Sequence, residues 1–358
     1  MQMTLSRTQQ EIVKTKEKKV VVMSAAASGK TACLSERAKY LLSQGYNPSR
    51  MVIITFTNAA AEVMRERIGP AGENIFIGTI HGYCNYLLRS NGVFTEDILD
   101  EDHFDELFER ITKYPEAIQP VDYLLLDEAQ DSTRLEYFFL LEMVEPKEFM
   151  LFGDIRQCIY EWRHASPDIL LNISKEPDVT VFNLIENYRN GAAILTYAKR
   201  FIEYLGPDYE DMSISRTGRL GSVKELQYNL AKMARYIKET PEYGRWFVLL
   251  RNNNQLTTVY NYLQGSGIPV DTFRRGDLSL EELRDKMKQN TVKVLTIHAA
   301  KGLENDFVIV YGCDGSRDAE EKRICYVAAT RAKERLYWFF NKNYEPRKPK
   351  QSNLISWE

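Results

Sequence analysis

The sequence contains no apolar run that approaches the ~18 residues needed for a membrane-spanning helix. Residues 1–7 also lack the apolar segment of a secretory signal. Cysteine is scarce, and its positions stand singly, in none of the spacings that bind a metal. These absences predict a cytoplasmic protein that does not contact a membrane and whose thiols are reduced and structural. The cysteines are Cys33, Cys84, Cys158, Cys313 and Cys325.

An excess of positive charge is missing as well. The 47 Lys and Arg residues face 50 Asp and Glu residues, which gives a formal net charge of −3 and a pI near 6.0. This balance excludes a surface coated with positive charge for indiscriminate binding of nucleic acid. A local groove of basic and aromatic side chains is still compatible with it, because stacking supplies roughly 1–3 kcal/mol per base whatever the charge elsewhere.

Short apolar runs alternate with amphipathic helical patterns along the whole chain. The runs are continuous rather than alternating, which is typical of parallel strands whose two faces are both covered by helices. The sequence therefore predicts an α/β fold. The predicted strands are 20–24, 51–56, 75–79, 122–127 and 149–153, and then 181–185, 223–227, 246–251, 268–273, 292–297, 306–311 and 335–340.

The length of 358 residues and the apolar fraction of 44% suit two domains with cores of their own. We place an N-terminal domain at 1–178 and a C-terminal domain at 179–345. The polar stretch 203–222 reads as a surface loop of the second domain, and 346–358, rich in Pro, Lys and Arg, reads as a frayed tail.

A loop of small residues follows the first predicted strand. Residues 24–31 read Ser-Ala-Ala-Ala-Ser-Gly-Lys-Thr, and a helical pattern begins after them. In such a loop the backbone N–H groups and the helix N-terminus converge on a phosphate, Lys30 reaches the β/γ-phosphates and Thr31 holds Mg²⁺. The usual first glycine is replaced by Ser24, and the alanines limit access to positive φ, so we expect a lowered nucleotide affinity.

A second motif follows the apolar run 124–126. Asp127 and Glu128 are adjacent carboxylates at the end of this predicted strand. Asp127 can hold the magnesium shell, and Glu128 can orient and deprotonate an attacking water. Together with the loop at 24–31, the pair indicates a nucleotide triphosphatase that uses Mg²⁺ and transfers phosphate to water.

Seven further segments follow one another in an order that, with these two motifs, resembles the UvrD/Rep family of superfamily 1 DNA helicases over nearly the full length. The Gln-containing segment 5–9 opens the series, and Asn-Tyr-Arg at 187–189 opens its second half. The segments are 5–9, 54–62, 78–82, 153–163, 187–189, 296–304 and 326–333.

The resemblance implies two RecA-like domains with an ATP cleft between them. It implies that Gln9 reads the adenine edge, that Tyr188 stacks on adenine, and that Arg189 and Arg331 reach across the cleft to the γ-phosphate. The implied catalytic residues are Lys30, Asp127, Glu128, Gln157, Arg189 and Arg331. The implied nucleotide contacts are Gln9, Ser28, Gly29, Lys30, Thr31, Arg37, Tyr188, Gly302 and Glu304, with Thr31 and Asp127 on the metal.

The same resemblance implies a single-stranded DNA partner, or a 3′-tailed duplex, along which the chain would move in the 3′ to 5′ direction. Closure of the cleft on ATP would alternate with release after hydrolysis. The implied DNA contacts are Phe56, Asn58, Thr79, His81, Tyr160, Trp162, Arg163, Thr296 and His298.

The chain departs from the family in its length. Only about 45 residues separate His81 from Asp127 and about 100 separate Arg189 from Thr296, too few for full-size accessory domains. A reduced insertion is expected at about 90–120, with an acidic helix whose charged face is solvated. Translocation on a single strand is therefore better supported than unaided unwinding.

Other interpretations stay open at this point. Residues 160–163 also fit an ordinary surface turn, either arginine finger could be a surface ion pair, and stacking does not distinguish DNA from RNA. A different class of function is a nucleotide-gated DNA-binding subunit beside a nuclease or another partner protein in a repair or antiphage defence complex. A small-molecule kinase is disfavoured because it leaves the second half of the chain unexplained.

Overall fold

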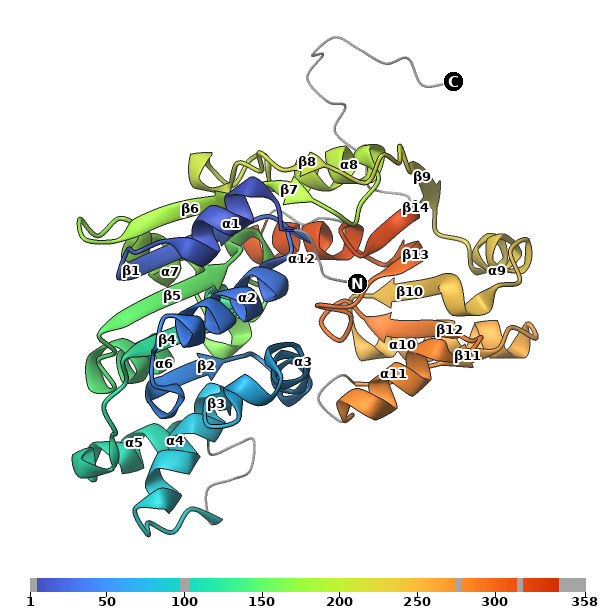
Figure 1. The fold of residues 1–358 in the computed structure, drawn as a ribbon. Helices are drawn as coiled ribbons and strands as arrows, with labels where there is room; N and C mark the ends of the chain where they lie inside the picture. Colours follow the sequence, from blue (N-terminus) through green and yellow to red (C-terminus); the bar gives the residue numbers. More distant parts are fainter. Residues whose placement is uncertain (1–4, 97–103, 275–277, 314–317, 341–358) are drawn as a thin grey trace. The chain divides into compact units, whose positions relative to one another are not determined.

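The computed structural model describes residues 5–96, 104–274, 278–313 and 318–340 (Figure 1). The chain divides into two compact units. Unit 1 comprises Met1–Tyr188, Met212–Ile214 and Gly276–Lys286, and unit 2 comprises Arg189–Asp211, Ser215–Arg275 and Met287–Glu358. Within the described ranges, no helix is long and apolar enough to cross a membrane.

Unit 1 is built on a six-stranded sheet in the order β3-β2-β4-β5-β1-β6, in which every pairing is parallel. The strand β1 lies between β5 and β6, so its carboxyl end is flanked on both sides. Parallel strands of this kind place their following loops at one edge of the sheet. The strands are β1 (Lys19–Ser24), β2 (Met51–Ile54), β3 (Phe76–Gly78), β4 (Tyr123–Leu126), β5 (Glu148–Gly153) and β6 (Thr180–Leu184).

Both faces of this sheet are buried, as its continuous apolar strands require. Val20 and Val22 point to one face and pack in a core with residues of α1, α2 and α3, whereas Val21 points to the other and is equally buried. The helices of unit 1 are α1 (Arg7–Lys14), α2 (Lys30–Ser43), α3 (Asn58–Ile68), α4 (Ile80–Ser90), α5 (Phe104–Thr112), α6 (Arg134–Phe138) and α7 (Pro167–Ser174).

Unit 2 repeats the plan with a second parallel sheet in the order β11-β12-β10-β13-β14-β9. One face packs against α9 and α10, and on the other Trp338 stacks on Phe201 of α8 at 4.8 Å between ring centroids. The strands are β9 (Ser222–Gln227), β10 (Trp246–Leu250), β11 (Val270–Asp271), β12 (Val292–Thr296), β13 (Asn305–Tyr311) and β14 (Ala332–Phe340). The helices are α8 (Ala192–Ile202), α9 (Leu230–Lys238), α10 (Asn253–Gly265) and α12 (Ala319–Ala329).

Two short segments from the second half of the sequence pack within unit 1. The Ile214 N–H donates to Ile185 O at 2.8 Å beside the two-stranded sheet of β7 (Glu186–Asn187) and β8 (Ile214–Ser215). The helix α11 (Leu280–Lys288) lies against α3, where Arg284 makes two hydrogen bonds to the Glu66 carboxylate at 2.8 and 2.6 Å. The stretch 203–222, predicted to be a loop of the second domain, thus contributes a strand residue to unit 1.

The predicted α/β class is confirmed, and every predicted strand has a counterpart in the structure. The strand predicted at 181–185 pairs with β1 in the first sheet, so unit 1 extends ten residues past the predicted division at 178. In the region of the predicted insertion, α5 exposes Glu106 but buries Leu107, Phe108 and Ile111, so this helix also contributes to a core. The predicted tail at 346–358 lies outside the described residues.

Candidate functional site

The loop between β1 and α2 is held at both of its ends. Ser24, which stands where a glycine is usual, donates from its hydroxyl to Gly153 O at the end of β5 at 2.9 Å. The Ala25 N–H donates to Leu184 O of β6 at 2.8 Å. Gly29 adopts φ 82° and is the N-cap of α2. The serine therefore ties the start of the loop to the neighbouring strand, a contact that glycine could not make.

Ala27 takes a left-handed backbone conformation with φ 56° despite its Cβ. Such a conformation costs alanine about 1–2 kcal/mol relative to glycine. The neighbouring chain compensates: Asn187 Nδ2 donates to Ala26 O at 2.9 Å, and the Tyr188 N–H donates to Ala27 O at 3.1 Å. The bulk of the alanines is thus accommodated because residues 187–188 brace the loop.

The centre of the loop has the features of an anion site. The Ser28 hydroxyl is buried and, within the part of the chain that the structure describes, lacks a hydrogen-bond partner. Lys30 and Thr31 occupy the first turn of α2, next to the N–H groups that a helix leaves unpaired at its start. A buried hydroxyl without a partner, an ammonium group and a helix N-terminus together fit a phosphate.

The carboxylate pair at the end of β4 faces this loop. Lys30 Nζ lies 3.1 Å from Glu128 Oε2, and the Glu128 backbone is left-handed with φ 52°. Burial alone would lower the pKa of Lys30, but the carboxylates of Glu128, Asp127 and Asp154 together raise it. Burial, with repulsion from Glu128, raises the pKa of Asp127 to about 7. The structure therefore brings together Lys30, Asp127 and Glu128, as the sequence predicts.

Gln130 is a functional candidate that the sequence reasoning missed. Its Nε2 donates to Glu128 Oε2 at 2.7 Å and to Asp131 Oδ2 at 3.2 Å, and its Oε1 accepts from the Asp154 N–H at 2.8 Å. The side chain is fully buried. Gln130 thus fixes the orientation of the Glu128 carboxylate against the end of β5. Its place two residues after Glu128 was the signal that could have found it.

The segment after β5 is organised around Asp154. Gln157 Nε2 donates to Asp154 Oδ2 at 2.7 Å, and Arg156 Nε donates to Asp154 Oδ1 at 2.6 Å. Arg156 also donates from Nη2 to Ser24 O at 3.1 Å. The predicted phosphate-facing Gln157 therefore lies in the same hydrogen-bonded set as the start of the loop at 24–31.

Two predicted nucleotide contacts are occupied by protein groups. Gln9 Oε1 accepts from the Ser6 N–H at 2.9 Å, and its Nε2 donates to Ser28 O at 2.9 Å, so binding an adenine edge would require it to exchange partners. Arg37 is buried and donates to Val13 O at 2.8 Å and to the Tyr123 hydroxyl at 2.9 Å, among other partners. Arg37 has a structural role here, and its contact with nucleotide stays a prediction.

Tyr188 lies half-exposed at the end of unit 1. Its hydroxyl donates to Glu186 Oε2 at 2.7 Å, while its backbone is bonded to Ala27 as described above. A phenol ring whose main chain is hydrogen-bonded to the loop at 24–31 is compatible with stacking on a base, which stays a prediction.

Four of the predicted DNA contacts form one aromatic cluster on unit 1. Phe56 and Tyr160 are stacked with their ring centroids 5.0 Å apart, and Trp162 meets Tyr160 edge-on at 6.4 Å. The Arg163 guanidinium lies 5.8 Å from the Phe56 ring centroid. Trp162 is 69% exposed. An exposed ring that packs on partly buried rings beside a cation is a combination that binds unpaired bases.

The remaining predicted DNA contacts of unit 1 begin helices. Thr79 is the N-cap of α4 and accepts from the Gly82 N–H at 3.1 Å, and Asn58 is the exposed first residue of α3. His81 is largely buried, with Nε2 3.8 Å from Glu136 Oε1 and its ring 5.1 Å from Phe108. The contacts of His81 are thus internal, whereas Asn58 is open to a ligand.

In unit 2 the two predicted arginine fingers both donate hydrogen bonds to residues 303–304 and to Thr330. Arg189 Nε donates to Glu304 Oε2, and its Nη1 donates to Thr330 O at 3.2 Å. Arg331 is buried and donates to Val327 O at 2.9 Å and to Leu303 O at 3.3 Å. The structure brings these arginines together within unit 2, and their reach to a phosphate stays a prediction.

The Glu304 carboxylate forms ion pairs with two basic side chains of unit 2, Arg189 and Lys333. Burial would raise its pKa, but Arg189 and Lys333, the latter 3.1 Å from Oε1, lower it to about 2. Gly302 adopts φ 80° in the preceding turn, and Thr296 accepts from the Ala299 N–H at 3.2 Å. Thr296 and His298 are partly buried where β12 ends, so their predicted DNA contacts also stay predictions.

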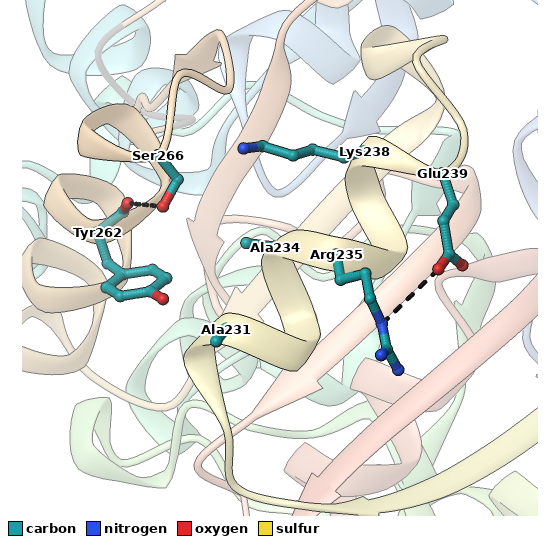
Figure 2. A pocket seen from close by; sticks show the side chains of 7 residues that line it. All are labelled: Ala231, Ala234, Arg235, Lys238, Glu239, Tyr262 and Ser266. Atoms are coloured by element: carbon teal, nitrogen blue, oxygen red, sulfur yellow. Dashed lines mark hydrogen bonds and ion pairs between the residues drawn. The ribbon is translucent and has the colours of Figure 1, made fainter.

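A shallow hollow of about 390 Å³ lies between α9 and α10 of unit 2 (Figure 2). Figure 2 shows Arg235 paired with Glu239 on α9, and Lys238 extended toward the Ser266 side of the hollow. None of the predicted site residues lines it. In the described ranges, no group of three or more His, Cys, Asp or Glu side chains could hold a metal.

The left-handed backbone of Ala27 predicts a difference between two alanines of the loop. We expect Ala27→Gly to leave the free energy of unfolding unchanged or to raise it by up to about 1 kcal/mol, because relief of strain exceeds the added entropy of the unfolded chain. Ala25→Gly, at a residue outside the left-handed region, should lower it by about 0.5–1 kcal/mol. Urea denaturation measures both, and equal destabilisation by the two would contradict the assignment.

The lowered pKa of Glu304 predicts a pH-dependent contribution to stability. Because the folded pKa lies below the ordinary value of 4.5, the contribution is present above that pH and is lost as the pH falls toward about 2. The side chain is 39% exposed, so we expect Glu304→Gln to cost about 1–2 kcal/mol at pH 7 and almost nothing near pH 2. Urea denaturation from pH 7 to pH 2 checks this, with Glu239→Gln as the exposed control; a constant difference across the range would refute it.

Two models of known protein domains match this chain, one in each half of the sequence. The UvrD/REP helicase N-terminal domain matches residues 5–116 and 103–178, and the UvrD-like helicase C-terminal domain matches residues 273–343. Together the two domains cover more than half of the chain.

Curated relatives point the same way. A "Probable DNA helicase" of Mycoplasma pneumoniae is 25% identical over 454 aligned positions, which cover 91% of this chain and 82% of that protein. The "ATP-dependent DNA helicase PcrA" of Bacillus subtilis is 26% identical over 290 positions, covering 56% of this chain and 39% of PcrA. The "Probable DNA helicase II homolog" of Mycoplasma capricolum is 24% identical, covering 66% and 47%.

The chain thus spans less than half the length of two of these three relatives. The matches nevertheless fall on both parallel sheets, on the phosphate loop and on the segment that carries Arg331. The chain belongs to the UvrD/Rep-like family of superfamily 1 DNA helicases.

Proposed function

We propose that this chain is an ATP-dependent motor on single-stranded DNA, a translocase or helicase that hydrolyses ATP at the loop 24–31. The observation that carries the proposal is the meeting of two motifs that lie 98 residues apart in the sequence. Lys30 Nζ is 3.1 Å from Glu128 Oε2, and the Ser28 hydroxyl of the same loop has no hydrogen-bond partner among the described residues. This contact supports a role for Lys30 in binding phosphate and for Glu128 in activating water.

The residues of unit 1 have separable roles in this proposal. The first turn of α2 and Lys30 would hold the β- and γ-phosphates, and Thr31 and Asp127 would hold Mg²⁺, which neutralises phosphate charge when bound. When Lys30 turns to the phosphates, the oxygen of Glu128 that it occupies becomes available to a water molecule. Gln130 keeps that carboxylate aimed while it accepts the proton.

Arg189 and Arg331 of unit 2 would complete the site. A guanidinium stabilises the charge that builds on the γ-phosphate as it passes to water. Arg189 would have to exchange Glu304 for phosphate, which would couple hydrolysis to a rearrangement of the 302–304 segment. The family resemblance supports this assignment, and it also supports movement in the 3′ to 5′ direction.

The aromatic cluster of Phe56, Tyr160, Trp162 and Arg163 is the proposed contact with unpaired bases. The segment 153–163 begins at the last residue of β5. Its second residue, Asp154, accepts a hydrogen bond from Gln157, and the segment continues to the exposed Trp162. A change at the phosphates could therefore be passed to the bases through about ten residues of continuous chain. The absence of full-size insertions between the motifs favours movement along one strand over unaided opening of a duplex.

Hydrolysis by this site predicts a specific effect of Glu128→Gln. The amide keeps the shape of the side chain but cannot accept a proton, so we expect turnover to fall about 10²-fold or more while ATP still binds. Steady-state phosphate release measures turnover, and equilibrium binding of a fluorescent ATP analogue measures affinity. Glu142→Gln, an exposed carboxylate of the same unit, serves as the control. Unchanged turnover in Glu128→Gln would remove this carboxylate from the mechanism.

Movement on DNA predicts that poly-dT stimulates ATP hydrolysis and that Trp162→Ala weakens this response. Loss of one stacking ring costs about 1–3 kcal/mol, so the poly-dT concentration for half-maximal stimulation should rise about tenfold or more. Hydrolysis without DNA should not change, since the Trp162 ring is mostly exposed and packs on Tyr160. Phe94→Ala, another exposed ring of unit 1, is the matched control. A lack of stimulation in the unmodified protein would defeat the motor proposal itself.

A further inference from the structure

Two of the five cysteines lie against each other in unit 2. The Sγ atoms of Cys313 and Cys325 are 2.8 Å apart, and both residues are buried. Cys313 follows β13 and Cys325 lies on α12. The contact between the two thiols therefore lies between the carboxyl end of a central strand and the helix that precedes Arg331.

The thiols of Cys33 and Cys84 lie near main-chain oxygens instead. Cys33 Sγ lies 3.7 Å from Gln9 O, and Cys84 Sγ lies 3.4 Å from Leu107 O. A metal would need further ligands, and within the described residues no third His, Cys, Asp or Glu joins the pair in a metal-binding group. Two thiols whose sulfur atoms lie this close can be oxidised jointly to a disulfide.

We propose that Cys313 and Cys325 form an intramolecular disulfide under oxidising conditions, which makes the pair a redox-modification site of unit 2. A disulfide bond measures about 2.05 Å, so the two sulfur atoms need to approach by only about 0.8 Å. The main chain of Cys313 is already fixed, because its carbonyl accepts from Trp338 Nε1 at 3.1 Å. The fold thus holds the thiols in place before any bond forms.

The oxidant is a low-molecular-weight disulfide such as oxidised glutathione. The thiolate of one cysteine attacks a reagent sulfur, breaking the S–S bond and releasing one glutathione thiol. The second cysteine thiolate then attacks the mixed disulfide and releases the second glutathione thiol. Two electrons pass to the reagent, and the two cysteine protons end on the released thiols. Because both thiols are buried, the reaction proceeds through local opening and is slow.

The bond would close a short loop between β13 and α12, and it would join two elements that are already packed together. Closing the loop between Cys313 and Cys325, which are 12 positions apart, restricts the unfolded chain, and the expected gain is a rise of about 5 °C in the melting temperature of the oxidised protein. The inference concerns modification of the fold and does not depend on the proposed motor activity.

The test incubates the full chain with oxidised glutathione a few degrees below its melting temperature. The protein is then quenched in acid, unfolded, alkylated, digested and analysed by mass spectrometry. We expect a cross-linked peptide containing Cys313 and Cys325, with Cys33, Cys84 and Cys158 alkylated. Cys84→Ser should keep the cross-link, and Cys325→Ser should lose it and carry glutathione on Cys313.

Alkylation of all five cysteines after this treatment would overturn the proposal, as would stable glutathione adducts on both residues without a cross-link. Thermal melting supplies an independent readout. The oxidised protein should melt about 5 °C above the reduced form, and Cys325→Ser should show no such rise. A lower melting temperature on oxidation would mean that the bond forms only in a distorted state, which also contradicts a native site. None of these readouts measures ATP hydrolysis, so their failure is separate from failure of the proposed function.

Discussion

The ion pair between Lys30 and Glu128 is the interaction on which the organisation of unit 1 depends. It places the first residue of α2 against the end of β4, with the end of β5 between them in the sheet. An ammonium group nine-tenths buried is stable only beside carboxylates, and the acidic residues in turn need the cation. The sheet order brings Lys30 and Glu128 together, and their opposite charges make the burial of Lys30 possible.

This arrangement explains how a loop rich in alanine can replace one rich in glycine. The cost of the left-handed Ala27 is offset by bonds from residues 187–188, and Ser24 adds a bond of its own to β5. The loop is thus held in its conformation by hydrogen bonds from other segments rather than by the conformational freedom of glycine. Its conformation is consequently a property of the neighbouring strands as much as of its own residues.

Much of this could be predicted from the sequence, because continuous apolar runs mark parallel strands and polar residues at their carboxyl ends must share an edge. That reasoning brought Lys30 and Glu128 together correctly. It did not single out Gln130, whose importance comes from accepting the main-chain N–H of Asp154, just after β5. The return of α11 to unit 1 was equally hidden, since only tertiary contacts such as Arg284 with Glu66 define it. The full engagement of Arg37 and Gln9 by protein groups likewise depends on packing that no local pattern records.

The chain passes from unit 1 to unit 2 between Tyr188 and Arg189. Tyr188 is bonded through its main chain to the phosphate loop, and the next residue, Arg189, already belongs to unit 2 and grips Glu304. The two attachments are consecutive in the sequence, so a single peptide bond joins the residue that is bonded to Ala27 to the residue that is bonded to Glu304.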